Sequence, residues 1–245
     1  MNPFKIIELN QTASTQTYIT NTDTEKPFEE YTVIFTSNQT AGRGQGTHIW
    51  ESEEGKNISF SLLLQPVFLN PAQQFLITQF VSLAIADTLA DYGLQNVKIK
   101  WPNDIYVGEK KICGMLIQNS IMGNQIFKTY IGIGINVNQK TFCLAPNPTS
   151  LLLETGKEYG LRKFLDDTLY NIYVRYSQLK ENKIPQIQKR YLSLLLFKNQ
   201  KRTYIYKGKE ISAQIENVNS FGHLLLRLDN GSVLECELRQ LQFVF

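Results

Sequence analysis

Residues 97–107 have the sequence VKIKWPNDIYV, and residues 110–114 have the sequence KKICG. The alternation of apolar and polar residues up to the tryptophan predicts a β-strand. Pro102 has no backbone N–H to donate to a sheet, so the strand should end there, and the following Asn-Asp pair should form a turn. Two further strands would then bring the Asp104 carboxylate and the Lys111 ammonium to one region. Spacing alone, however, favours an ordinary meander whose turn happens to carry charge.

A glycine-rich segment, QTAGRGQGTHIW, occupies residues 39–50. Its three glycines at alternate positions disfavour a stable strand or helix and leave backbone N–H groups free. Most segments of this kind are flexible hairpin loops; the alternative is an anion-binding loop, in which Arg43 and the free N–H groups close over phosphate. The spacing matches neither the P-loop nor the dinucleotide-binding fingerprint. His48 has no acid or nucleophile near it in the sequence, and we assign it no role.

Other positions allow a structural or a ligand-binding interpretation. Ser14 precedes a short polar segment and is typical of a helix N-cap. Gly132 and Gly134 share one face of a predicted strand, where they leave room for a bulky neighbouring side chain or for a flat ligand. The residues alone leave both interpretations open. Trp50 taken by itself is more typical of a core anchor.

The composition is that of an ordinary globular protein. The 245 residues are 42% hydrophobic and 19% charged, and the formal net charge of +3 is not concentrated in a basic run that would favour nucleic acid binding. No apolar run reaches the length of a membrane span, and the N-terminus lacks the layout of a signal peptide. Three widely spaced cysteines, Cys113, Cys143 and Cys236, suggest neither a disulfide framework nor a metal site. We therefore expect a cytoplasmic protein with no membrane partner.

The character of the chain changes near residue 198. Before it, helical periodicity predicts a long amphipathic helix from the Asn70-Pro71 start and two more helices over 161–180 and 184–197. Beyond it, short strands alternate with tight turns. We predict an α+β fold in two domains, 1–198 and 199–245, with a mixed sheet flanked by helices in the first and a small β-barrel as the second. The strands predicted for the second domain are 203–206, 211–215, 224–228, 233–237 and 242–244.

These segments resemble the signature of the biotin protein ligases. The five-residue identity Lys-Trp-Pro-Asn-Asp at 100–104, followed by Lys111 and Gly114, is specific because it contains both Trp and Pro. The family also has a Ser-Thr pair near its first helix, a Gly-Arg-Gly loop that ends in Trp, a Gly-x-Gly-x-Asn strand and a C-terminal SH3-like barrel. The resemblance covers nearly the whole chain in order. It implies a catalytic core like that of class II synthetases and biotin ligases, followed by the SH3-like barrel.

The resemblance also implies three groups of site residues. Lys111, Arg43 and Asp104 would be catalytic, and Asp104 would hold Mg²⁺. ATP or the adenylate would be bound by Arg43, Trp50, Asn103, Lys111 and Asn136. Biotin would be bound by Ser14, Thr15, Gln16, Gln39, Gly42, Arg43, Gly44, Gln45, Lys111, Gly114, Gly132 and Gly134.

The sequence departs from the family pattern at four positions. Gln16 replaces the Asn of Ser-Thr-Asn, and Gln45 stands where some members have a second Arg. Gly46 and Thr47 stand where a basic residue and then a glycine are usual. The loop therefore carries less positive charge than in those relatives, and we expect it to retain an adenylate less tightly.

The implied activity is ATP-dependent and AMP-forming. Biotin and ATP would form biotinyl-5′-adenylate, and biotin would then pass to a lysine of a biotin carboxyl carrier domain, of the acetyl-CoA carboxylase type. The alternatives are a lipoate–protein ligase and a non-catalytic sensor that binds biotin or its adenylate. Family members that double as repressors carry an N-terminal helix-turn-helix domain, for which the segment before Ser14 leaves no room. We therefore expect no DNA partner, and a monomer or weak homodimer.

Overall fold

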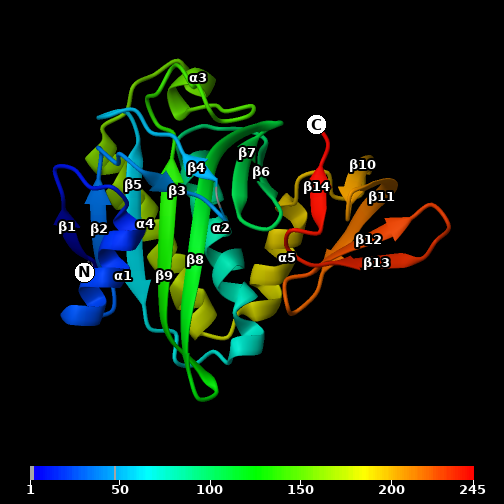
Figure 1. Cartoon of the computed structure of the whole chain (residues 1–245), viewed down its shortest axis with the longest axis horizontal. Helices are drawn as coiled ribbons and strands as arrows, with labels where there is room; N and C mark the ends of the chain where they lie inside the picture. Colours follow the sequence, from blue (N-terminus) through cyan, green and yellow to red (C-terminus); the bar gives the residue numbers. More distant parts are fainter. Residues whose placement is uncertain (1–2, 47) are drawn as a thin grey trace.

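A mixed seven-stranded sheet forms the centre of the protein in the computed structural model, which describes residues 3–46 and 48–245. The strands lie in the order β1-β2-β5-β9-β8-β7-β6 (Figure 1). The β1–β2 pair is parallel and the other neighbours are antiparallel. The predicted α+β class with a mixed sheet is thus confirmed. The strands are β1 Lys5–Glu8, β2 Thr32–Thr36, β5 Ile58–Leu64, β6 Val97–Lys100, β7 Asp104–Val107, β8 Lys110–Met122 and β9 Gln125–Ile135.

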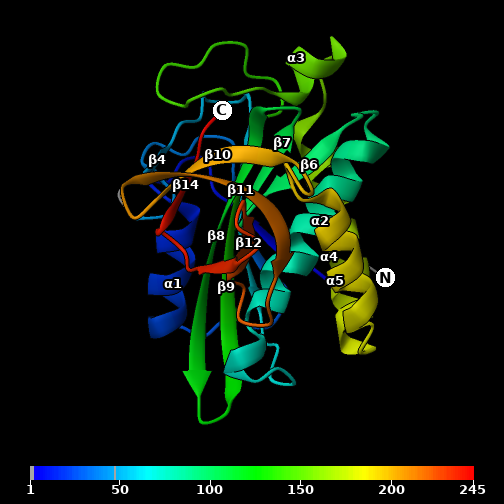
Figure 2. The same cartoon turned by 90° about the vertical axis from the view of Figure 1, so that its right-hand side faces the viewer.

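Helices cover both faces of this sheet (Figure 2). On one face, α1 (Thr15–Glu25) contacts β2, β5 and β9. On the other, α2 (Phe75–Asp91) contacts β6 and β7 and is itself covered by α4 (Leu161–Lys180) and α5 (Ile184–Leu194). The expectation that α2 is amphipathic is wrong: because it lies between the sheet and two helices, it is buried on nearly all sides.

The predicted N-cap of α1 agrees with the structure, whereas the predicted start of α2 and end of α5 differ from it. Ser14 caps α1, since its hydroxyl accepts a hydrogen bond from the backbone N–H of Thr17. The Asn70-Pro71 start leads into a 3₁₀ turn, Pro71–Gln73, and α2 begins only at Phe75. Helix α5 ends before residue 197, because the Leu196 N–H donates to the Ile99 carbonyl at 2.8 Å and so ties the chain to β6.

A second sheet follows α5 and packs beside the first (Figure 1). It is antiparallel throughout, in the order β13-β12-β11-β10-β14. All five predicted strands are present, and the closure of this sheet into an SH3-like barrel stays a prediction. The strands are β10 Lys201–Tyr206, β11 Lys209–Val218, β12 Leu224–Leu228, β13 Val233–Cys236 and β14 Leu241–Phe243.

The two sheets share one continuous hydrophobic core. Ile215 and Leu226 of the second sheet belong to the same buried cluster as Ile99 and Ile133 of the first. Across the junction, Arg202 pairs with Glu109 at 2.8 Å. Across residues 3–46 and 48–245, no helix is both long enough and apolar enough to cross a membrane.

Candidate active site

A cavity of about 730 Å³ lies at the edge of the central sheet, where β7, β8 and β9 meet the glycine-rich segment and the second sheet. Most residues that the sequence assigns to a binding site come together here, although they are spread over some 120 positions of the chain. Those that line the cavity are Ser14, Thr15, Gln16, Gln39, Arg43, Gly44, Gln45, Trp50, Asn103, Asp104, Lys111, Gly114, Gly132 and Gly134.

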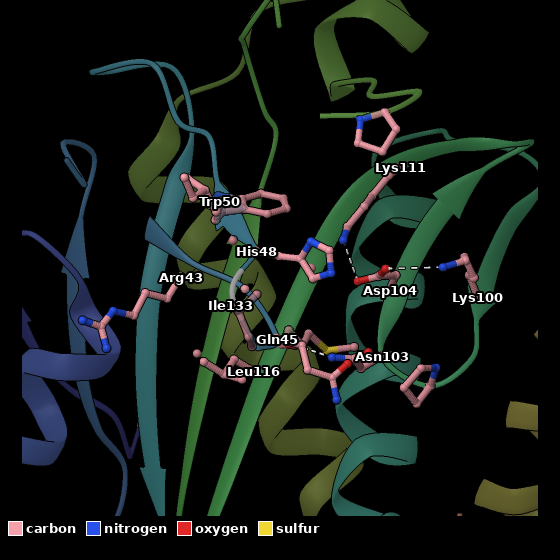
Figure 3. Close-up of a pocket in the computed structure, with 18 of the residues that line it drawn as sticks. Arg43, Gln45, His48, Trp50, Lys100, Asn103, Asp104, Lys111, Leu116 and Ile133 are labelled. Atoms are coloured by element: carbon pink, nitrogen blue, oxygen red, sulfur yellow. Dashed lines mark hydrogen bonds and ion pairs between the residues drawn. The ribbon is translucent and has the colours of Figure 1, made fainter. Parts of the chain in front are cut away.

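Asp104 and Lys111 meet as the central stretch of sequence predicts. The Lys111 Nζ lies 2.8 Å from one carboxylate oxygen of Asp104, and the Lys100 Nζ lies 4.0 Å from the other (Figure 3). Antiparallel pairing of β7 with β8 sets this geometry: Asp104 is the first residue of β7 and pairs with Gly114, and Lys111 is the second residue of β8 and pairs with Tyr106. The carboxylate thus lies between two ammonium groups.

Lys100 is a cavity residue that the sequence assignment missed. Its Nζ lies 5.1 Å from the centre of the Phe243 ring and 5.8 Å from that of Tyr106. Burial lowers the pKa of this ammonium most strongly; Asp104 raises it and Lys111 lowers it further, so the pKa lies below its usual value. The signal was present in the sequence, since Lys100 begins the Lys-Trp-Pro-Asn-Asp identity.

The turn that carries Asp104 is anchored on three sides. The Trp101 indole N–H donates to the Gly222 carbonyl at 2.8 Å, and the Tyr191 hydroxyl donates to the Pro102 carbonyl at 3.0 Å. The Asn103 side chain lines the cavity and donates to the Met115 carbonyl. Hydrogen bonds from α5, β8 and the second sheet therefore fix the position of the turn.

The glycines of β8 and β9 face side chains of this same chain. A methyl group added at Gly134 would collide with the Trp50 indole, and one added at Gly114 would lie 3.0 Å from it. One added at Gly132 would lie 2.8 Å from the Gln16 amide oxygen. The expectation that a flat ligand lies directly on these glycines is therefore corrected: Trp50 and Gln16 lie there, and a ligand would meet their outer surfaces.

The polar end of the cavity is a connected network. The Gln39 amide oxygen accepts from the backbone N–H of Thr15 at 3.0 Å and lies 3.3 Å from its hydroxyl. The Gln16 amide donates to Gln118 at 2.9 Å and accepts from Ser61 at 3.0 Å. Gln16 is thus held in place by the protein itself, with its polar atoms largely committed before a ligand arrives.

The glycine-rich segment is more regular than expected. Strands β3 (Gly42–Arg43) and β4 (Ile49–Trp50) form a short antiparallel hairpin, although the glycines were expected to prevent a strand. Arg43 lines the cavity, but its side chain points away from the Asp104–Lys111 pair (Figure 3). Gly42 does not line the cavity; it allows close packing against the Trp50 carbonyl. Thr47 lies outside the described residues.

Asn136 lies behind the cavity wall and does not line it. It is 3% exposed, and its side chain donates to the Thr149 carbonyl at 2.9 Å. Its predicted contact with adenine therefore stays a prediction, and its observed contact is with the chain that follows β9.

Two further cavity residues were not found from the sequence. His48, to which the sequence assigned no role, points into the cavity (Figure 3). Arg239 reaches the cavity from the turn before β14, with a backbone φ of 73°. Only the three-dimensional fold brings this turn to the central sheet. The described lining residues include four cationic side chains, those of Arg43, Lys100, Lys111 and Arg239, but only one acidic side chain, that of Asp104. The cavity therefore favours a polyanionic ligand.

The mixed sheet flanked by helices and its cation-rich cavity define an α+β protein with a site for an anionic ligand, and comparison with known proteins gives the family. A match to the biotin/lipoate A/B protein ligase family spans residues 8–136, more than half of the chain. The chain belongs to this family.

Individual relatives give the same result. The bifunctional ligase/repressor BirA of Bacillus subtilis is 36% identical over 112 residues, which are 45% of this chain and 34% of that protein. The human biotin–protein ligase is 30% identical over 141 residues, 56% of this chain and 18% of that protein. The matched regions thus span about a third or less of these relatives. Among solved structures, the Aquifex aeolicus biotin protein ligase in complex with biotin and ATP has a TM-score of 0.81 and 26% identity, with 98% of both chains covered.

Proposed function

We propose that the protein is a biotin–protein ligase, which activates biotin with ATP to biotinyl-5′-AMP and then transfers biotin to a lysine of a biotin carboxyl carrier domain. The observation that carries the proposal is the Lys100–Asp104–Lys111 array beside Trp50, in a cavity where cations predominate. The likeness over the whole chain to a ligase in complex with biotin and ATP supports it.

In the first step, a biotin carboxylate oxygen attacks the α-phosphorus of ATP, and the bond to pyrophosphate breaks. Two anions must approach each other, so the reaction needs positive charge fixed in advance. Lys111 is suited to this role, because Asp104 holds its ammonium on one side and the Trp50 ring centre lies 5.8 Å away on another. Arg239, which lines the cavity from the turn before β14, would contact the outer phosphates, whereas the Arg43 side chain points away from Asp104 and Lys111 and would have to turn toward the phosphates to contact them (Figure 3).

In the second step, the acceptor lysine amine attacks the carbonyl of the mixed anhydride, and AMP leaves. The anhydride is already activated, so no cysteine or serine of this chain has to form a covalent intermediate. The biotin would lie along the network formed by Thr15, Gln16 and Gln39, in which the bonds of Gln16 to Gln118 and Ser61 fix the shape of the polar end of the cavity.

The residues around Asp104 do not fit a resident Mg²⁺ ion. Both carboxylate oxygens face ammonium groups, and the described residues contain no group of three or more Asp, Glu, His or Cys side chains placed to hold a metal ion. Mg²⁺ usually binds one or two carboxylates together with waters and substrate phosphates. We therefore propose that Asp104 orients Lys111 and Lys100, and that any Mg²⁺ arrives bound to the ATP phosphates.

We also propose that residues 1–198 and 199–245 are two domains that share the cavity. The change from helices to short strands near residue 198 supports the boundary. The second domain would complete the ATP end of the cavity through Arg239 and Phe243, which line it. The proposed partner is a carrier domain that presents one lysine at the cavity mouth.

Labelled biotin, MgATP and a biotin-acceptor domain, incubated with the protein and separated by denaturing electrophoresis, test the function. We expect label on the acceptor, and none on an acceptor whose target lysine is changed to arginine. Incorporation of lipoate but not biotin would identify a lipoate ligase. Tight binding of biotin with no ATP-dependent incorporation would identify a sensor and contradict the proposal.

A further inference from the structure

Glu51 joins two segments that form the wall of the cavity without lining the cavity itself. It follows Trp50 directly at the end of β4. One of its carboxylate oxygens accepts a hydrogen bond from the backbone N–H of Cys143 and the other from that of Leu144, each at 2.8 Å. These two residues belong to the connection between β9 and α3 (Leu151–Thr155), here called the 138–149 connection. A single side chain thus links the β3–β4 hairpin to this connection.

The 138–149 connection reaches the proposed catalytic lysine. Pro146 and Asn147 line the cavity. The Asn147 carbonyl accepts from the backbone N–H of Lys111 at 2.7 Å, and the Lys111 carbonyl accepts from Thr149 at 2.8 Å. A shift of the connection would therefore move the backbone from which the Lys111 side chain extends.

Little else holds the outer part of this connection. In the part of the chain that the structure describes, the hydrogen bonds that tie residues 140–146 to another segment are the two that Glu51 accepts. Leu144 is 66% exposed and none of residues 140–146 is fully buried, since Phe142 and Ala145 are half-buried and the other residues are exposed, so apolar packing there is limited. Hydrogen bonds to an ionised carboxylate are among the stronger ones in proteins.

The inner ends of the two segments are fixed separately. The Gln139 amide oxygen accepts from the backbone N–H of Glu53 at 3.0 Å and from the Asn57 side chain. Gln139 and Asn57 are buried. Loss of Glu51 would therefore release only the outer part of the connection and leave the fold intact.

We propose that Glu51 is a positioning residue that holds the β3–β4 hairpin and the 138–149 connection together as one cover, and that this cover retains the activated adenylate in the cavity. The second half of the proposal rests on the proposed ligase function. Glu51 acts through its neighbours: Trp50 belongs to the hairpin, and Lys111 is bonded to the connection.

The first measurement is hydrogen exchange without ligand, which does not depend on the reaction. In Glu51→Gln, one acceptor oxygen is lost and an amide N–H₂ group faces a backbone N–H. We expect exchange at residues 140–146 to become about tenfold faster, while α2 and β5 keep wild-type exchange. Glu54→Gln is the matched control, because it removes the same charge from an exposed side chain of the same segment. Equal exchange in the wild type and Glu51→Gln would overturn the proposed link.

The second measurement is the release of adenylate formed from labelled biotin and ATP in the presence of pyrophosphatase, followed by a chase with unlabelled biotin. We expect about tenfold faster release from Glu51→Gln, intermediate release from Glu51→Asp and wild-type release from Glu54→Gln. Biotin affinity without ATP should be unchanged, which separates positioning from a general loss of structure. Unchanged release with faster exchange would overturn the retention role alone. A wild type that forms no adenylate would overturn the proposed function and with it the retention role, while the exchange measurement would still decide the link.

Discussion

The Trp50 indole lies directly on the backbone of Gly134. A methyl group at Gly134 would collide with indole atoms Cε2 and Nε1, and the same ring also covers Gly114. The ring centre is 5.8 Å from the Lys111 Nζ. Because Gly134 has no side chain, the Trp50 indole can pack directly on β9. In that position it forms one wall of the cavity beside Lys111, the proposed catalytic lysine.

Gly134→Ala should displace the indole and reduce kcat/KM for ATP about a hundredfold, because small displacements of positioning groups have effects of this size. Overpacking should also reduce the free energy of unfolding by about 1–3 kcal/mol. Gly160→Ala is the control, since nothing lies within 4 Å of its added methyl group. Steady-state kinetics and urea denaturation provide the measurements. Wild-type kinetics in Gly134→Ala would contradict the assigned role of this contact.

Lys111→Ala should leave a folded protein that forms adenylate about a hundredfold more slowly, because a fixed charge at the developing phosphorane stabilises it by about 3 kcal/mol. The neighbouring Lys110 provides a matched control: its side chain is 62% exposed and pairs with Glu154 at 3.5 Å. Lys110→Ala should keep wild-type pyrophosphate release. Normal release by Lys111→Ala would remove Lys111 from the mechanism.

Most of the helices and strands were predictable because the local sequence pattern and the tertiary packing favour the same secondary structure. The strand, proline and turn of residues 97–107 specify their own hairpin, and the helix over 161–180 appears with the predicted bounds. The predictions were wrong where a distant partner decides the outcome. Helix α2 is buried by α4 and α5, and α5 ends early because Leu196 bonds to Ile99. Periodicity within a segment contains no information about such partners.

The same distinction applies to the site. Asp104 and Lys111 belong to one hairpin, so their approach follows from sequence alone. Arg239 and Phe243 reach the cavity only because the second sheet packs there. Gly132 and Gly134 on one face of a strand predicted that a flat group, either a ligand or a side chain, packs on Gly134. The sequence does not show which, because the position of Trp50 depends on how the β3–β4 hairpin folds back over β9.

One of the three cysteines should react quickly in the folded protein. Cys143 is exposed, whereas Cys113 and Cys236 are buried. Burial raises the pKa of the Cys113 thiol far above its usual range and that of Cys236 to about 11. A thiol-specific colorimetric reagent at pH 8 should titrate one group before denaturation and three after it.

Cys113→Ala should keep most of the ligase activity, because the proposed reaction uses no protein nucleophile. Loss of turnover in a folded Cys113→Ala variant would contradict that mechanism.

The buried Asp23 should stabilise the protein in a pH-dependent manner. Burial opposes its ionisation most strongly, but hydrogen bonds from Lys128, Tyr130 and the Phe28 N–H outweigh burial and hold its pKa below the usual 3.8. A lowered pKa gives stability that is present above pH 3.8 and is lost as the pH falls through the folded-state value. Asp23→Asn should therefore reduce the free energy of unfolding by about 3 kcal/mol at pH 7.

The deficit of Asp23→Asn relative to the wild type should shrink as the pH falls below 3.8. Urea denaturation of both proteins at pH 7 and pH 3 measures this difference. A deficit that is equal at the two pH values would mean that the charge of Asp23 contributes nothing.

Arg239→Gly should weaken ATP binding without lowering the free energy of unfolding. Arg239 has a φ of 73°, a conformation that glycine adopts without steric cost, so the variant should unfold with equal or slightly greater free energy, by up to about 1 kcal/mol. The guanidinium lines the cavity, so its loss should raise KM for ATP about tenfold while KM for biotin stays unchanged. An unchanged KM for ATP would place Arg239 outside the nucleotide site.

The hydrogen bond between Trp101 and Gly222 joins residues 121 positions apart in the chain. Contacts of such long range form late, since a large loop must close before they contribute free energy. A folding intermediate in which only the central sheet has formed would lack the wall that the second sheet contributes, so the cavity would be open on that side. Ligand binding is therefore a reporter of the last stage of folding.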